Sequence, residues 1–166
     1  DLAFIAGLRQ RALAFCLGLK STAACWHANE AWTSAIPAPP YLGRGRHRVG
    51  VPAKPRIHTV AEIRQGIATD QWRQVAYRDG VDGKPLVREF VALRAHLTNG
   101  QQVKDGITPD ASDELWLLLE RPSGSTDKNG IKQYAISGPD AMSLDELAQI
   151  SHVRPVIERN SYENAK

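Results

Sequence analysis

A run of prolines and glycines in the first third of the chain most constrains how it can fold. Proline lacks a backbone donor and fixes φ, while glycine favours turns, so no regular helix or strand continues through such a run. The residues that break regular structure are Pro37, Pro39, Pro40, Gly43, Gly45, Gly50, Pro52 and Pro55. We therefore predict a long loop or linker over residues 34–57, with structured segments on both sides.

The same run is strongly basic, and no acid occurs between Glu30 and Glu62. Its candidate DNA-binding side chains are Arg44, Arg46, Arg48, Lys54 and Arg56, with His47 among them. Contacts to phosphate need positive charge more than they need a fixed shape, so this pattern suits a polyanion. A solvated linker has a similar composition, and the sequence leaves both interpretations open.

Composition places the chain among ordinary globular proteins. Of its 166 residues, 42% are hydrophobic and 23% are charged. The net charge of +3 is unevenly placed, because residues 1–60 carry eight Lys or Arg against two acids. No apolar run approaches the roughly 18 residues that span a bilayer, and no signal peptide is evident, which predicts a cytoplasmic protein without membrane contact. Cys16 and Cys25 lack a partner at metal-ligand spacing and are expected to be reduced, structural thiols.

The chain opens with a pattern typical of an α/β unit. Apolar residues recur at helical spacing over residues 2–13, which predicts an amphipathic helix. The segment Ala14–Leu19 then has the composition of a short buried strand. Because a helix is followed directly by a strand, we expect the chain to begin within an α/β unit whose preceding strand lies outside this sequence.

Residues 58–140 have the pattern of an antiparallel sheet. Val60–Ile67 is a short helix candidate, and the expected strands are Trp72–Arg78, Leu86–Leu97, Glu114–Glu120 and Lys132–Ser137. Asp-Gly and Asn-Gly dipeptides at residues 79–80, 82–83, 99–100 and 129–130 favour hairpin turns between them. In the second strand, alternation predicts one apolar face towards the core and one wet face that carries Arg88, Arg94 and His96.

The last segment combines helix signals with a possible metal ligand. Ser143-Leu-Asp-Glu146 is a capping box that predicts a helix through about Ile150. Pro155 disfavours helix at the residue before it, so we predict that a second helix begins there with Glu158 in its first turn. One acid flanked by Arg and Lys suits a divalent ion beside a phosphate, whereas a Glu in a first turn is also an ordinary partner of the helix dipole.

Three segments carry a family resemblance. They are Asp1–Leu8 with Ala14–Trp26, the two stretches Trp72–Gly80 and Glu114–Pro122, and Arg154-Pro-Val-Ile-Glu158 followed by Lys166. In this order they resemble the C-terminal part of the catalytic domain in bacterial insertion-sequence transposases of the DDE class, in the group with a β-rich insertion before the last catalytic Glu.

The resemblance implies a partial RNase H-like α/β fold with an inserted antiparallel β-rich module. Residues 1–33 would belong to the RNase H-like core, residues 34–57 to a basic linker, residues 58–140 to the insertion, and residues 141–166 to the C-terminal helices of the core. The function implied is metal-dependent cleavage and transfer of DNA strands at transposon ends, carried out by a complete enzyme that acts as a homodimer.

The resemblance also assigns roles to single residues. Glu158 would be a catalytic residue and a ligand of Mg²⁺ or Mn²⁺, Arg154 and Lys166 would contact DNA phosphates, and Trp72 would stack on a displaced base. In the family, three carboxylates hold two ions that clamp the attacking and leaving oxygens. The first two catalytic Asp residues have no counterpart here, so this chain alone is expected to bind no metal and to cleave no DNA.

Two departures from the family signature leave alternatives open. The signature places Tyr where this chain has Ser151, and it has six residues between Glu and Lys where this chain has seven. Glu163 therefore competes with Glu158 as the metal ligand. A non-catalytic nucleic-acid-binding module and a degenerate remnant of a mobile element remain alternative interpretations of the whole chain.

Overall fold

The helices and strands belong to a mixed α/β protein with an antiparallel sheet. The computed structural model describes residues 2–27, 35–51, 56–99, 113–124 and 130–163, and for residues 154–163 only the helical backbone. The helices are α1 (Leu2–Gln10), α2 (Val60–Gly66) and α4 (Leu144–Glu163), with a 3₁₀ turn, η1, at Thr69–Gln71. The strands are β1 (Cys16–Gly18), β2 (Ala24–His27), β3 (His58–Thr59), β4 (Arg73–Asp79), β5 (Pro85–Thr98), β6 (Leu115–Pro122) and β7 (Lys132–Ile136).

One sheet contains all seven of these strands. Their order is β1-β7-β6-β5-β2-β3, and β4 also pairs with β5. The long strand β5 pairs with β6 along one edge, while on its other edge β4 pairs with residues 85–90 and β2 with residues 95–98. The β4–β5, β5–β6 and β6–β7 pairings are antiparallel, as the turn dipeptides predict. The β1–β7, β2–β3 and β2–β5 pairings, which were not predicted, are antiparallel as well. Segments within residues 16–27 and 58–136 therefore contribute strands to the same sheet.

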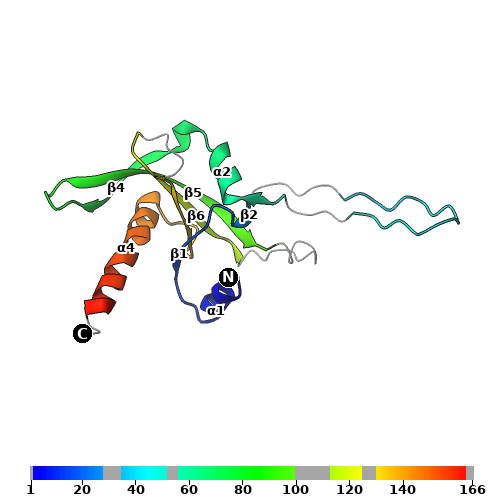
Figure 1. Ribbon diagram of the computed structural model, residues 1–166, viewed down its shortest axis with the longest axis horizontal. Coiled ribbons are helices and arrows are strands. Elements are labelled where there is room, and N and C mark those ends of the chain that lie inside the picture. Colours follow the sequence, from blue (N-terminus) through cyan, green and yellow to red (C-terminus); the bar gives the residue numbers. More distant parts are fainter. Residues whose placement is uncertain (1, 28–34, 52–55, 100–112, 125–129, 164–166) are drawn as a thin grey trace.

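Both faces of the sheet are covered, which corrects the prediction of one wet face. Phe90, Leu118 and Ile136 lie on the face that packs against α4, while Ala95, Leu117 and Leu119 lie with Val60 of α2 on the other face (Figure 1). His96, expected in water, is only 7% exposed and stacks on Trp26. Burial lowers the pKa of His96 and favours its neutral form.

Helix α4 is continuous from Leu144 to Glu163, so the prediction of two helices separated at Pro155 is wrong. The expected capping box is present, because the Ser143 hydroxyl accepts from the amide of Glu146 and the Glu146 carboxylate accepts from the amide of Ser143. A proline inside a helix removes one hydrogen bond and crowds the carbonyl four residues earlier, but it does not always end the helix. Glu158 consequently lies in the second half of a long helix and not in a first turn.

None of the helices in the described part of the chain is both long enough and apolar enough to cross a membrane. Helix α4 has the necessary length, but charged residues occur among its apolar residues from the first turn to the last. The buried side of its first turns consists of Leu147, Ala148 and Ser151. These residues pack on the sheet, which explains why a helix of this composition forms.

Candidate nucleic-acid interface

The basic run forms an arm that projects from the sheet. Its described residues, 35–51, make two limbs that run out from the end of the molecule where β2 and β3 lie and return (Figure 1). Ile36 and Val51 join the limbs at the base, where each amide donates a hydrogen bond of 2.8 Å to the carbonyl of the other. The predicted loop is therefore a hairpin-like arm, which we call the basic arm.

A close approach of the two limbs depends on Gly50. A Cβ atom at this position would lie 2.7 Å from the carbonyl oxygen of Ile36 and 2.8 Å from the amide nitrogen of Ala38. Both neighbours are backbone atoms, so they cannot move away as a flexible side chain would. The absence of a side chain at Gly50 thus allows the limbs to lie together at the base of the basic arm.

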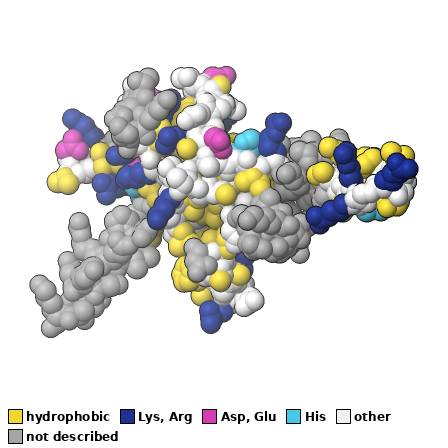
Figure 2. Space-filling model, turned by 45° about the vertical axis from the view of Figure 1, so that its right-hand side comes forward, with side chains coloured by type: hydrophobic (Ala, Val, Ile, Leu, Met, Phe, Trp, Pro, Cys, Tyr) yellow, Lys and Arg dark blue, Asp and Glu magenta, His cyan; other side chains and the backbone are white. Residues whose placement is uncertain are grey.

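The outer part of the basic arm carries its positive charge. Arg44, Arg46 and Arg48 are all exposed, and no acid occurs in residues 35–51. Figure 2 shows dark blue Arg side chains along the basic arm with no acidic side chain among them. The ring of His47 stacks on that of Tyr41, with 5.0 Å between the centroids and 16° between the planes. This arrangement presents three guanidinium groups to solvent on a narrow support.

The other residues predicted to bind DNA near this run have different outcomes. Arg56 is exposed and lies two residues before β3, at the foot of the returning chain. Lys54 lies outside the described residues. The structure therefore gathers Arg44, Arg46 and Arg48 on one element.

Trp72 is half-buried between η1 and β4. Its ring packs against the apolar cluster around Cys25 and Val60, and the guanidinium carbon of Arg121 lies 4.3 Å from the ring centroid. One face of the indole therefore already has a cationic neighbour, which is a common structural use of tryptophan. The predicted stacking of Trp72 on a DNA base stays a prediction.

The residues expected around the catalytic acid lie far from the basic arm. Arg154 and Glu158 belong to the second half of α4, and the competing Glu163 ends that helix, but their side chains lie outside the described residues. Lys166 also lies outside the described residues. In Figure 1 this half of α4 runs away from β1 and from the sheet, and the basic arm projects from the opposite end of the molecule. The structure does not bring these two groups of predicted site residues together.

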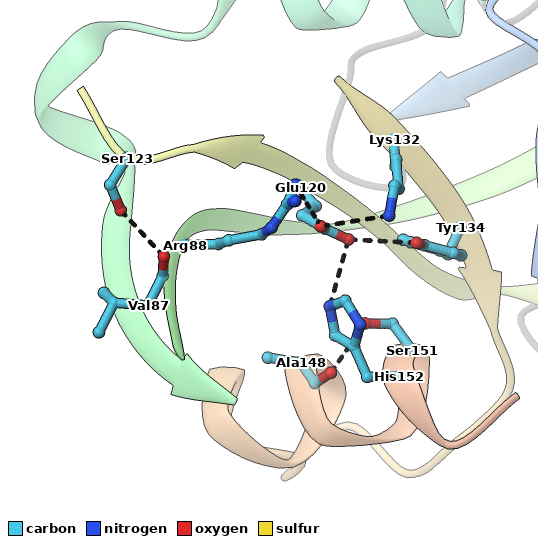
Figure 3. Close-up of polar contacts among 9 residues, drawn as sticks. All are labelled: Val87, Arg88, Glu120, Ser123, Lys132, Tyr134, Ala148, Ser151 and His152. Atoms are coloured by element: carbon cyan, nitrogen blue, oxygen red, sulfur yellow. Dashed lines mark hydrogen bonds and ion pairs between the residues drawn. The ribbon is translucent and has the colours of Figure 1, made fainter. Parts of the chain in front are cut away.

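A buried carboxylate that sequence reasoning missed connects α4 to the sheet. Glu120, near the end of β6, is fully buried on the face that α4 covers. Arg88 of β5 lies 2.9 Å from it, Tyr134 of β7 donates a hydrogen bond of 3.1 Å, and His152 of α4 approaches to 3.4 Å (Figure 3). Lys132 lies 3.8 Å away on the other side.

The electrostatics of this cluster favour an ionised Glu120. Burial by itself would raise the pKa of a carboxyl group. The contact and charge of His152, followed by the charges of Lys132 and Arg88, outweigh burial and lower the pKa of Glu120 below its usual value. Burial together with the neighbouring carboxylate raises the pKa of Tyr134, which therefore stays protonated and donates to Glu120.

His152 also packs against aromatic side chains. Its ring stacks on Tyr77, with 3.9 Å between centroids, and meets Phe90 edge-on. The residue two positions before Arg154 is thus fixed against the sheet by both a contact with the Glu120 carboxylate and ring packing. The signal available in the sequence was a Glu at the end of the apolar run Leu115–Leu119, which usually indicates a surface position.

The described residues do not fit a divalent metal. Among residues 2–27, 35–51, 56–99, 113–124 and 130–153, no group of three or more His, Cys, Asp or Glu side chains is arranged to hold an ion. Mg²⁺ requires several oxygen ligands in octahedral geometry, and the Glu120 carboxylate is already surrounded by positive partners.

Cys25 behaves as a core residue. It is fully buried in the cluster between the sheet and α2, and burial raises its pKa to about 12. A protonated, inaccessible thiol is a poor nucleophile and a poor metal ligand.

Comparisons with models of protein families, with curated proteins and with solved structures give no match for this chain.

Proposed function

We propose that this chain binds DNA through the basic arm, as part of a DDE-class transposase. The observation that carries the proposal is the projection of Arg44, Arg46 and Arg48 on an exposed, acid-free element. Guanidinium groups pair with phosphate through a planar fork of donors, and a projecting support lets several of them reach one nucleic-acid backbone. Contacts of this kind give affinity that falls steeply with salt.

The transposase assignment adds a catalytic role that depends on the resemblance. In this proposal, α1, β1 and α4 belong to an RNase H-like core, and Glu158 is one of three carboxylates whose other two lie beyond this sequence. The wide separation of the basic arm from α4 restricts the proposal: the basic arm would hold DNA at a distance from the scissile phosphate. Mg²⁺ would supply charge neutralisation and water activation in the complete enzyme.

The test of DNA binding compares two triple substitutions of equal charge. Arg44→Ala, Arg46→Ala and Arg48→Ala are combined on the basic arm, and Arg73→Ala, Arg78→Ala and Lys84→Ala are combined on the β4–β5 hairpin, where all three residues are exposed. Affinity for a labelled duplex is measured by fluorescence anisotropy between 50 and 200 mM salt.

The basic-arm variant is expected to lose at least about tenfold in affinity at the lower salt concentration. The slope of log association constant against log salt concentration is expected to become less negative by about 2 to 3. Each lost phosphate contact removes about 0.9 from this slope. The hairpin variant should stay close to the wild type. Equal losses in both variants, or no binding by the wild type, would contradict the proposal.

A non-catalytic DNA-binding module is the second candidate function. It is favoured by the exposed, acid-free basic arm, which could bind phosphates without any catalytic carboxylate. The two candidates differ when the chain is joined to the upstream part of a complete transposase. Cleavage of DNA that needs Mg²⁺ and disappears in Glu158→Gln supports the transposase, whereas binding without any cleavage supports the module.

A further inference from the structure

The tip of the basic arm has an unusually open backbone. Gly43 and Gly45 adopt φ values of +73° and +80°, and no atom lies within 4 Å of the place where a Cβ would stand on either residue. Arg44 lies between these glycines and Arg46 directly follows the second. The resulting Arg-Gly-Arg tip offers two guanidinium groups on a backbone that another surface can approach closely.

The tip is also braced in one shape. The stacked rings of Tyr41 and His47 lie on the two sides of the bend at residues 43–46, and the hydroxyl of Tyr41 lies 3.5 Å from the carbonyl oxygen of Gly45. The paired limbs at Ile36 and Val51 hold the base. A preformed tip loses less conformational entropy on binding than a flexible loop of the same composition.

The dimensions of the two DNA grooves discriminate between modes of binding. The major groove, about 12 Å wide, accepts a two-stranded ribbon whose polar side chains read base edges. In the outgoing limb of the basic arm, residues 35–42, Tyr41 is the one polar side chain, and the other residues are Ala, Ile, Leu and Pro. This limb therefore offers few groups that could read base edges in the major groove. The minor groove, about 6 Å wide, accepts a narrow backbone with arginines, and A·T-rich segments narrow it further and attract arginine more strongly.

We propose that the Arg44-Gly45-Arg46 tip enters the DNA minor groove and prefers A·T-rich sequence. The inference rests on the proposed DNA-binding function and specifies how the basic arm performs it. Leu42, 89% exposed beside Gly43, then has a role as an apolar contact to the groove. Minor-groove proteins often place such side chains against the base steps.

Three duplexes of equal length separate this mode from its alternatives. One contains an A·T-rich centre, one a G·C-rich centre, and one an inosine·cytosine centre. Inosine lacks the amino group that guanine presents in the minor groove, so its pair with cytosine matches A·T there and matches G·C in the major groove. The wild-type chain is expected to bind the A·T and inosine·cytosine duplexes about tenfold more tightly than the G·C duplex.

Each other ranking has a defined meaning. If inosine·cytosine behaves like G·C, the basic arm reads the major groove and the inference is wrong. If all three duplexes bind equally, only phosphates are contacted, and the inference fails while DNA binding stands. If no duplex binds, the proposed function fails as well. Tighter binding to double-stranded RNA or to phosphatidylglycerol vesicles than to any duplex would also overturn the inference.

Two variants test the tip itself. Arg44→Lys combined with Arg46→Lys keeps the charge but loses the guanidinium fork, and it is expected to bind G·C duplex within about twofold of the wild type while losing the A·T preference. Gly45→Ala places a side chain at a positive φ and is expected to lose the same preference. The control Gly66→Ala, at an ordinary φ with open space around it, should keep the preference. Retention of the preference in both tip variants would overturn the inference.

Discussion

At the scale of single residues, Glu120 has the least expected environment. A carboxylate without solvent exposure is costly unless its charge is matched, and here Arg88 of β5 and Lys132 of β7 match it, while His152 of α4 contacts it. A buried ionic cluster of this kind adds little stability over an apolar core. It is nevertheless sensitive to removal of one partner, because the remaining charges lose their compensation.

Glu120→Gln is therefore expected to lower the free energy of unfolding by about 2 kcal/mol, since the cations beside it are left without a counter-charge. Chemical denaturation followed by circular dichroism measures the change. The matched control is Asp82→Asn, which removes an exposed pair with Lys84 at 3.8 Å and should change stability by less than about 0.5 kcal/mol. Equal effects of the two substitutions would show that the Glu120 cluster has no special role.

The lowered pKa of Glu120 also predicts a pH dependence. Because its pKa is lower in the folded than in the unfolded state, the ionised group stabilises the fold above the ordinary Glu value, and this contribution disappears as pH falls through the folded pKa. Denaturation at pH 6 and at pH 3 should show a larger loss for the wild type than for Glu120→Gln. Parallel losses in the two proteins would contradict the assignment of this titration to Glu120.

At the scale of elements, the sequence predicted those whose signals are local. The boundaries of β4, β5, β6 and β7 lie within one or two residues of the prediction, because apolar alternation and turn dipeptides mark them directly. Strands β2 and β3 were not predicted. They are four and two residues long, and they are strands because β2 pairs with the distant β5 and β3 with β2.

In helix α4 a local sequence signal gave a wrong prediction, because Pro155 does not end the helix in the folded chain. Pro155 is a strong helix breaker in isolation. In the folded chain the helix is already fixed before that residue, because Leu147 and Ala148 are buried against the sheet and His152 contacts Glu120. Tertiary contacts of this kind cannot be read from spacing within one segment, which is also why the Glu120 cluster was missed.

Gly50→Ala tests whether the basic arm needs its paired limbs. The added Cβ would meet backbone atoms of Ile36 and Ala38, so the limbs should separate and affinity for DNA should fall severalfold. Global stability should change by less than about 0.5 kcal/mol, because the basic arm is exposed and contributes nothing to either core cluster. Affinity by anisotropy and stability by denaturation are measured on the same sample, with Gly66→Ala as the control.

At the scale of the whole molecule, charge is unevenly distributed. The sequence alone showed that positive charge is concentrated in the first 60 residues, since composition needs no structure to be read. The position of that charge relative to Glu158 was not predictable, because it depends on the path of the chain between them. The structure puts the basic arm and the end of α4 at opposite ends of the molecule, as Figure 1 shows.

This separation predicts that Glu158→Gln will not weaken DNA binding by the chain. The substitution removes a negative charge far from the basic arm, so affinity measured by anisotropy should equal or slightly exceed that of the wild type. The triple Arg variant of the basic arm serves as the positive control for loss. A severalfold loss in Glu158→Gln would mean that the helix end takes part in binding.

Strands β1 and β2 precede the basic arm in sequence, but they are held in the sheet by β7 and β5, which follow it. The exposed bonds after Arg44, Arg46 and Arg48 are accessible to trypsin, and a nick there separates β1 and β2 from their partner strands in sequence but not in space. After brief digestion, the two pieces should elute together as one peak in gel filtration without denaturant. In a denaturing gel they should run as two bands. The two pieces, co-expressed from separate genes, should then assemble into the folded protein.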